Sequence, residues 1–137
     1  MPTYLLDTGI LIRHLRSCAG YRELVHRLNE GGDLCISAFT RVEVLRGMRD
    51  HEREPTLALL DSFFTQVIDR ATADQAGEWL RAWQSRGVTL SGPDAVIAAS
   101  ALQVRAALVT TNARHFPMRE LVVLSVDDHG QISTVDR

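Results

Sequence analysis

The chain has 137 residues, of which 45% are hydrophobic and 23% charged, a composition typical of a globular domain and not of a disordered or fibrous protein. Its formal net charge of −2 gives no overall attraction to nucleic acid, which argues against a passive DNA-binding protein. All 15 basic residues are arginine, which excludes chemistries that need a lysine, such as P-loop nucleotide hydrolysis and Schiff-base catalysis.

The sequence carries no sign of export or membrane insertion. No apolar stretch approaches the ~20 residues needed to cross a bilayer, and no basic segment precedes the apolar run at the N-terminus. We therefore expect a cytoplasmic protein without a membrane partner. Cys18 and Cys35 lack the close spacing of zinc ligands, and we expect both to be small buried hydrophobic residues.

Apolar strand-like segments alternate with amphipathic helical segments along the chain. The expected strands are residues 4–6, 34–36, 67–68, 108–110 and 121–124. The expected helices are residues 9–16, 21–29, 38–48, 55–64, 72–86 and a short apolar helix that begins near residue 93. The alternation predicts an α/β fold, with a mostly parallel central sheet of about five short strands and helices on both faces. We expect one domain over residues 1–137, with a polar, loosely held tail from about residue 126.

Polar residues and proline indicate where several helices begin. Thr8 and Ser37 are expected to cap the first and third helices. Thr72 and Gln75 have the spacing of a capping box, which places the start of the fifth helix there. Pro93 suits the first turn of the following helix.

Three acidic residues lie within apolar runs, near expected strand–helix junctions. Asp7 ends the first strand, Glu43 is surrounded by apolar residues of the third helix, and Asp94 opens the short apolar helix. Carboxylates gathered in a partly dry place repel one another and are costly to desolvate, so such a cluster commonly holds a cation. Taken singly, each acid has an ordinary explanation: a helix cap, a partner of Arg46, and a favourable charge at a helix N-terminus.

A second polar group follows the fourth expected strand. In open α/β sheets, ligand sites form outside the carboxyl ends of the strands. Asp7 occupies that end of the first strand, and Thr110 and Asn112 occupy that end of the fourth. In most proteins these last residues would pass as ordinary turn residues.

Four segments together resemble the PIN-domain family, and within it the VapC-type toxins of bacterial toxin–antitoxin pairs. The segments are LLDTGILI at 5–12, ISAFTRVEVLRG at 36–47, PDAVIAASAL at 93–102 and LVTTNARHF at 108–116. They occur in the family's order and spacing and cover nearly the full chain. The resemblance implies a three-layer PIN-like fold and a metal-dependent endoribonuclease that hydrolyses phosphodiester bonds in RNA.

The resemblance also implies roles for individual residues. Asp7, Glu43 and Asp94 correspond to catalytic acids that bind Mg²⁺ or Mn²⁺, and Asn112 occupies a fourth catalytic position that often carries an acid. An amide adds no negative charge, so we expect one firmly held metal ion. The residues expected to bind substrate, through charge for the arginines, are Thr110, Arg13, Arg41, Arg46, Arg114 and His115.

The family's partners follow from the same resemblance, and two other functions remain open. The resemblance implies a cognate small antitoxin, of the VapB type, that covers the active site, and a homodimer. A metal-dependent phosphatase of the haloacid-dehalogenase class would need a second aspartate where this chain has Gly9. A PIN-like RNA-binding module with weak or no catalysis is conceivable because Asn112 replaces an acid.

Overall fold

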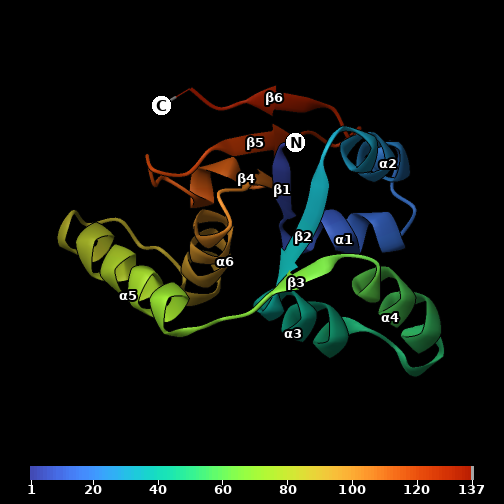
Figure 1. The fold of residues 1–137 in the computed structure, drawn as a ribbon, viewed down its shortest axis with the longest axis horizontal. Coiled ribbons are helices and arrows are strands. Elements are labelled where there is room, and N and C mark those ends of the chain that lie inside the picture. The colour runs from blue at the N-terminus through green and yellow to red at the C-terminus, as the bar shows by residue number, and fades with distance from the viewer. Residues whose placement is uncertain (137) are drawn as a thin grey trace.

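A computed structural model describes residues 1–136 of the chain as a six-stranded sheet with helices packed around it (Figure 1). The strands lie in the order β3-β2-β1-β4-β5-β6. Their bounds are β1 Thr3–Leu6, β2 Asp33–Ser37, β3 Phe64–Gln66, β4 Ala107–Thr110, β5 Val123–Val126 and β6 Ile132–Thr134. The first five strands are parallel, and β6 pairs antiparallel with β5. The predicted α/β class is confirmed, and the expected number of about five strands is corrected to six.

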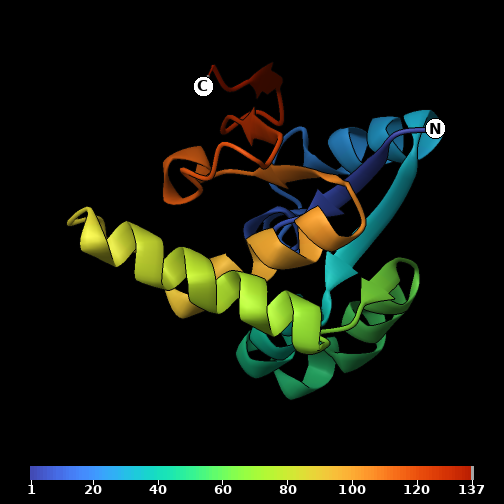
Figure 2. The same ribbon diagram turned by 60° about the vertical axis from the view of Figure 1, so that its left-hand side comes forward.

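The helices cover both faces of the sheet. Their bounds are α1 Thr8–Leu15, α2 Tyr21–Gly31, α3 Ala38–Gly47, α4 Arg53–Asp61, α5 Arg70–Ser85 and α6 Gly92–Gln103, with 3₁₀ turns η1 at Asp50–Glu52 and η2 at Ala113–His115. Helices α5 and α6 pack together against one face, and α1 and α2 cover the other (Figures 1 and 2). No helix within residues 1–136 is long and apolar enough to cross a membrane.

The two faces have separate hydrophobic cores because side chains alternate along each strand. Leu5 and Leu108 point into the core under α5 and α6, whereas their neighbours Leu6 and Val109 point into the core under α1 and α2. All four side chains are fully buried. Strands buried on both faces read as continuous apolar runs, which explains why these short segments are recognisable in the sequence.

The order of the strands creates one special position at the carboxyl edge of the sheet. Strand β1 lies between β2 and β4, and the chain runs outward through β2 and β3 before it returns to the other side of β1 as β4. At such a switch point the connections after the neighbouring strands β1 and β4 leave toward opposite sides. The connections after β1 and β4, which contain Asp7 and Thr111, meet there.

Two of the three predicted helix caps are wrong. Asp7, and not Thr8, is the N-cap of α1, because its carboxylate accepts the backbone N–H of Thr8. Asp69, and not Thr72, is the N-cap of α5, and its Oδ1 accepts hydrogen bonds from both the backbone and the hydroxyl of Thr72. Ser37 caps α3 as predicted, by accepting the backbone N–H of Phe39.

The region between α3 and α5 differs most from the prediction. Helix α4 begins at Arg53, so Pro55 is its third residue, and the helix ends at Asp61 instead of residue 64. The expected strand at 67–68 is wrong: β3 lies at Phe64–Gln66, paired with β2, and Val67 follows it in the link to α5. Strand β5 likewise starts two residues later than expected, at Val123.

The C-terminal segment is held against α2 and is not a loose tail. Gly20 and Gly130 both have positive φ, and their backbones pack so closely that a Cβ on Gly130 would lie 2.5 Å from the carbonyl oxygen of Gly20. The Tyr21 hydroxyl donates to the Asp127 carbonyl at 2.8 Å, and Arg27 donates to the Gly130 carbonyl. These contacts fix the turn that leads into β6. Residue 137, the end of the expected tail, lies outside the described residues.

Candidate active site

Asp7 is the most enclosed acid of the chain. It follows the last residue of β1 and caps α1, and it is 6% exposed. Its Oδ1 accepts the backbone N–H of Thr8 at 2.8 Å, and its Oδ2 accepts the hydroxyl of Thr110 at 2.6 Å. Both carboxylate oxygens are therefore oriented by donors, one from the first turn of α1 and one from the end of β4.

Glu43 reaches the same edge from α3. Its Oε1 accepts the hydroxyl of Thr8 at 2.6 Å, and the Thr8 hydroxyl also lies 3.1 Å from that of Thr40. Because a hydroxyl has one proton, donation by Thr8 to Glu43 leaves Thr8 to accept from Thr40. Thr8 thus holds Glu43 beside the residue that caps α1. No ion pair joins Glu43 to Arg46 among residues 1–136, which removes the ordinary explanation for this acid.

Asp94 lies in the first turn of α6. Ser91 caps this helix by accepting the backbone N–H of Asp94 at 3.1 Å, and Pro93 lies in the first turn, as predicted. The Oδ2 of Asp94 lies 3.5 Å from Nδ1 of His115, an ion pair when that histidine is protonated. The positive end of the α6 dipole also favours a carboxylate at this position.

The negative charges of Glu43 and Asp94 both act on the carboxylate of Asp7. Burial raises the pKa of Asp7, the hydrogen bonds from Thr110 and Thr8 lower it, and the negative charges of Asp94 and Glu43 raise it further. Glu43 lies 36 positions after Asp7 and Asp94 lies 87 positions after it, and both therefore influence the same carboxylate. Such like-charge repulsion is relieved when a cation binds among the carboxylates.

The donor set suits a hard divalent cation, although the side chains do not form a ready-made cage. Carboxylate oxygens are the ligands that Mg²⁺ and Mn²⁺ prefer. Within residues 1–136, no three acidic, histidine or cysteine side chains lie in an arrangement that would already hold a metal ion. Glu43 is turned to Thr8 and Asp94 to His115. The chemistry and the converging charge fit a metal ion, and these two side chains would have to turn from their present partners to bind it.

Asn112 lies beside this cluster but is turned toward its own loop. Its backbone N–H donates to the Thr110 hydroxyl at 3.0 Å, and its Nδ2 donates to the Thr111 hydroxyl at 3.4 Å. Thr110 therefore links Asn112 and Asp7 through one hydroxyl group. The side chain of Asn112 is exposed, and its hydrogen bonds join it to the loop instead of to an acid.

The arginines expected to bind substrate fall into two groups. Arg13 is paired with Asp128 at 3.1 Å and Arg41 with Asp61 at 3.0 Å, so part of their charge is neutralised. Arg46 and Arg114 are exposed, and their side chains form no hydrogen bond or ion pair with any of residues 1–136. His115 contacts Asp94 and so lies at the acidic cluster itself.

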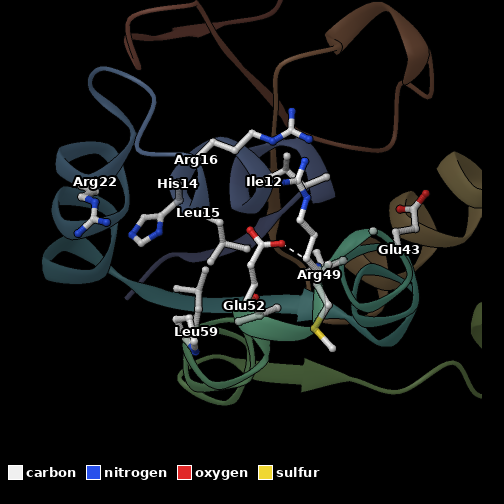
Figure 3. A pocket seen from close by; sticks show the side chains of 14 residues that line it. Ile12, His14, Leu15, Arg16, Arg22, Glu43, Arg49, Glu52 and Leu59 are labelled. Atoms are coloured by element: carbon white, nitrogen blue, oxygen red, sulfur yellow. Dashed lines mark hydrogen bonds between the residues drawn. The ribbon is translucent and has the colours of Figure 1, made fainter.

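The structure adds residues that sequence reasoning missed. Thr8 and Thr40 form the hydrogen bonds that hold Glu43 beside Asp7. In the sequence, the signal for Thr8 is its position directly after Asp7, but the same position also predicts a helix cap. A cavity of about 550 Å³ opens beside Glu43, between α1, α3 and the η1–α4 segment (Figure 3). Arg16 and Arg49 line it, whereas Asp7 and Asp94 do not. Arg16 and Arg49 lie far apart in the chain, and no pattern in the sequence predicts that they line one cavity.

The fold and the site define an α/β protein with an acidic, oxygen-lined centre at the switch point of a parallel sheet. The PIN domain family matches the chain over residues 4–120. Ribonuclease VapC19 of Mycobacterium tuberculosis is 39% identical over 119 residues, which cover 83% of this chain and 92% of that protein. Ribonuclease VapC10 of the same species is 34% identical over 116 residues, which cover 85% and 87%. The chain therefore belongs to the PIN-domain family, in which it is similar to VapC ribonucleases.

A solved structure shares the fold. The crystal structure of VapBC2 from Rickettsia felis, bound to a DNA fragment from its promoter, contains a chain that superposes with a TM-score of 0.80 at 20% identity. The match covers 91% of this chain and 99% of that one.

Proposed function

We propose that this chain is a metal-dependent endoribonuclease, the toxin of a toxin–antitoxin pair. The observation that carries the proposal is that Asp7, Glu43 and Asp94, which are distant in the sequence, lie close enough together for Asp94 and Glu43 to raise the pKa of Asp7. The similarity to VapC19 and VapC10, both named ribonucleases, supports RNA as the substrate.

In this proposal, Asp7, Glu43 and Asp94 hold Mg²⁺ or Mn²⁺, and Asn112 contributes an amide at their margin. A bound divalent cation would supply Lewis-acid polarisation of a phosphoryl oxygen and activation of a water molecule. The chain's own residues supply orientation: Thr110 fixes one oxygen of Asp7, and Thr8 fixes one oxygen of Glu43. Nearby arginines would offset the charge of the RNA backbone.

The test compares RNA cleavage by purified, partner-free protein in Mg²⁺, in Mn²⁺ and in chelator. Asp7→Asn and Asp94→Asn should each lower the cleavage rate at least about a hundredfold, because each removes a charge that acts on the metal. Asp74→Asn is the matched control, since Asp74 is an exposed acid of α5. Cleavage that persists in chelator, or in both site variants, would refute the proposal.

A non-catalytic RNA-binding module is the second candidate, and the amide of Asn112 favours it. Such a protein would bind RNA without cleaving it even in excess Mn²⁺. The same experiment separates the two functions, because parent protein that binds RNA but leaves it intact under every metal condition supports the second.

We also infer that the chain acts with a small antitoxin protein and as a homodimer. The likeness in fold to a chain of the R. felis VapBC2 complex supports the antitoxin partner. The edge strand β3 supports the homodimer, because Phe64 in this strand is 65% exposed and Val67, just after the strand, is 62% exposed. Light scattering should give twice the chain mass for the parent and a single chain mass for Phe64→Asp. A monomeric parent would refute the dimer.

A further inference from the structure

A cavity opens beside Glu43, next to the acidic centre. Figure 3 shows Glu43 at one end of it and His14 and Arg22 at the other, with Arg16 and Arg49 between them. Its volume of about 550 Å³ is in the range of small-ligand pockets. One end of the cavity is therefore formed by a residue that the proposed function assigns to the metal.

The cavity lining holds three arginines and two acids, and none of these arginines forms an ion pair with a residue that the structure describes. The guanidinium groups of Arg16 and Arg49 form no hydrogen bond or ion pair with any residue that the structure describes, and Arg22 donates only to the Ser17 hydroxyl. The other lining acid, Glu52, accepts the backbone N–H of Arg49 at 2.7 Å. Buried Nδ1 of His14 also has no hydrogen-bond partner among the described residues. The lining thus offers unused donors to an anion.

Part of the lining between the arginines is apolar. Side chains from α1, α3, α4 and the residue after α3 provide this surface, and they are Ile12, Leu15, Val44, Met48, Pro55 and Leu59. A site with cationic groups at its rim and an apolar floor matches a nucleotide, which has a charged phosphate and a flat base. Only an unpaired base can leave its stack and lie against such a floor.

We propose that this cavity binds the nucleotide next to the scissile phosphate of a single-stranded RNA, with its phosphate between Arg16 and Arg49 and its base against the apolar floor. The inference rests on the proposed function. An acidic peptide would match the same charges. RNA is favoured because the cavity begins at Glu43, so a strand whose reacting phosphate lies at the acids can continue directly into it.

The test measures binding of a fluorescein-labelled single-stranded RNA by anisotropy in chelator, over a series of salt concentrations. In single strands, log K falls with log salt by about 0.7 for each neutralised phosphate, so loss of the one phosphate contact in the double variant Arg16→Gln/Arg49→Gln should flatten the slope by about 0.7. Arg16→Lys/Arg49→Lys keeps the charge and should keep the slope. Arg105→Gln is the control, because Arg105 is exposed at the opposite edge of the sheet.

Cleavage in Mn²⁺ provides the second readout. The glutamine double variant should raise KM about tenfold with kcat nearly unchanged, as expected for lost binding that is equal in ground and transition states. An unchanged salt slope, or equal affinity for a duplex of the same sequence, would overturn the inference. Retained RNA affinity with lost binding to a protein partner would assign the cavity to that partner instead. Failure of the parent to cleave in metal would instead refute the proposed function.

Discussion

The hydroxyl of Thr110 donates to Oδ2 of Asp7 at 2.6 Å and so joins two residues that are 103 positions apart. The bond crosses from the end of β4 to the end of β1, at the switch point of the sheet. It is the largest of the influences that lower the pKa of Asp7 and partly offsets the effect of burial. One threonine therefore makes a buried carboxylate tolerable where the acids meet.

Replacing Thr110 by valine should destabilise the protein. The buried oxygen of Asp7 would lose its donor, and the free energy of unfolding should fall by about 1–3 kcal/mol. Urea unfolding in chelator measures the change. Thr110→Ser keeps the hydroxyl and should lose less than half as much. If serine is as damaging as valine, the methyl group and not the hydrogen bond is what matters.

Replacing Asp7 by asparagine should stabilise the metal-free protein while abolishing RNA cleavage. Because the pKa of Asp7 is raised in the folded state, the folded protein binds this proton more tightly than the unfolded chain. The ionised carboxylate of Asp7 therefore destabilises the folded protein. The destabilisation grows as the pH rises from the pKa of Asp7 in the unfolded chain through its higher pKa in the folded protein. In chelator, Asp7→Asn should unfold at higher urea than the parent at neutral pH, with no such gain at low pH.

Asp69 gives a control of opposite sign for that experiment. Hydrogen bonds from the backbone and then the hydroxyl of Thr72 lower the pKa of Asp69. Its stabilisation is present above the unfolded pKa and is lost as pH falls through the folded value. Asp69→Asn should therefore unfold at lower urea than the parent at neutral pH. If Asp7→Asn and Asp69→Asn change the urea midpoint in the same direction at neutral pH, ionised Asp7 does not destabilise the folded protein.

The two cysteines should react with alkylating reagents at very different rates. Burial raises the pKa of the Cys35 thiol to about 11, and the residue is 3% exposed. Only the thiolate reacts, so Cys35 should stay unmodified by iodoacetamide at pH 8 in folded protein. The partly exposed Cys18 should be modified, and mass spectrometry after proteolysis distinguishes the two. Equal labelling in native conditions would show that β2 opens readily.

Two glycine substitutions should change stability in opposite directions. A Cβ on Gly20 would overlap the carbonyl oxygen of His129, and the φ of Gly20 is +86°. Gly20→Ala should therefore lose more than the ~1–2 kcal/mol that the left-handed conformation alone costs. Gly77 lies in α5 with open space around it, and Gly77→Ala should gain about 0.5–1 kcal/mol. Thermal unfolding measures both, and a harmless Gly20→Ala would show that the C-terminal turn is not held as described.

The sequence predicted the elements that are buried on both sides and the edge at which the acids gather. Leu5, Leu6, Leu108 and Val109 form runs that only a covered strand explains, and these runs located β1 and β4. Asp7 was placed correctly because a polar residue that ends such a run must lie at the carboxyl edge of a parallel strand. The class of fold followed from these observations.

Edge elements were poorly predicted because few contacts determine them. In the segment Phe64–Ile68 the sequence predicts a strand at Val67 and Ile68, but Phe64 pairs with Cys35, which leaves Val67 and Ile68 outside the strand and exposed. Strand β6 has an exposed, polar sequence and exists because the turn at Asp127 returns the chain to β5. The Asp127–Gly130 turn was a sequence signal that could have revealed it.

Strand β1 acquires one neighbour early in synthesis and the other late. Strand β2 follows β1 closely, but β4 begins only at Ala107, after most of the chain has left the ribosome. Until then Asp7 has no Thr110 beside it, and β1 lacks the backbone pairing that β4 provides. The carboxylate at the centre of the acidic cluster therefore receives the hydroxyl that stabilises it only after β4 has joined β1 in the sheet.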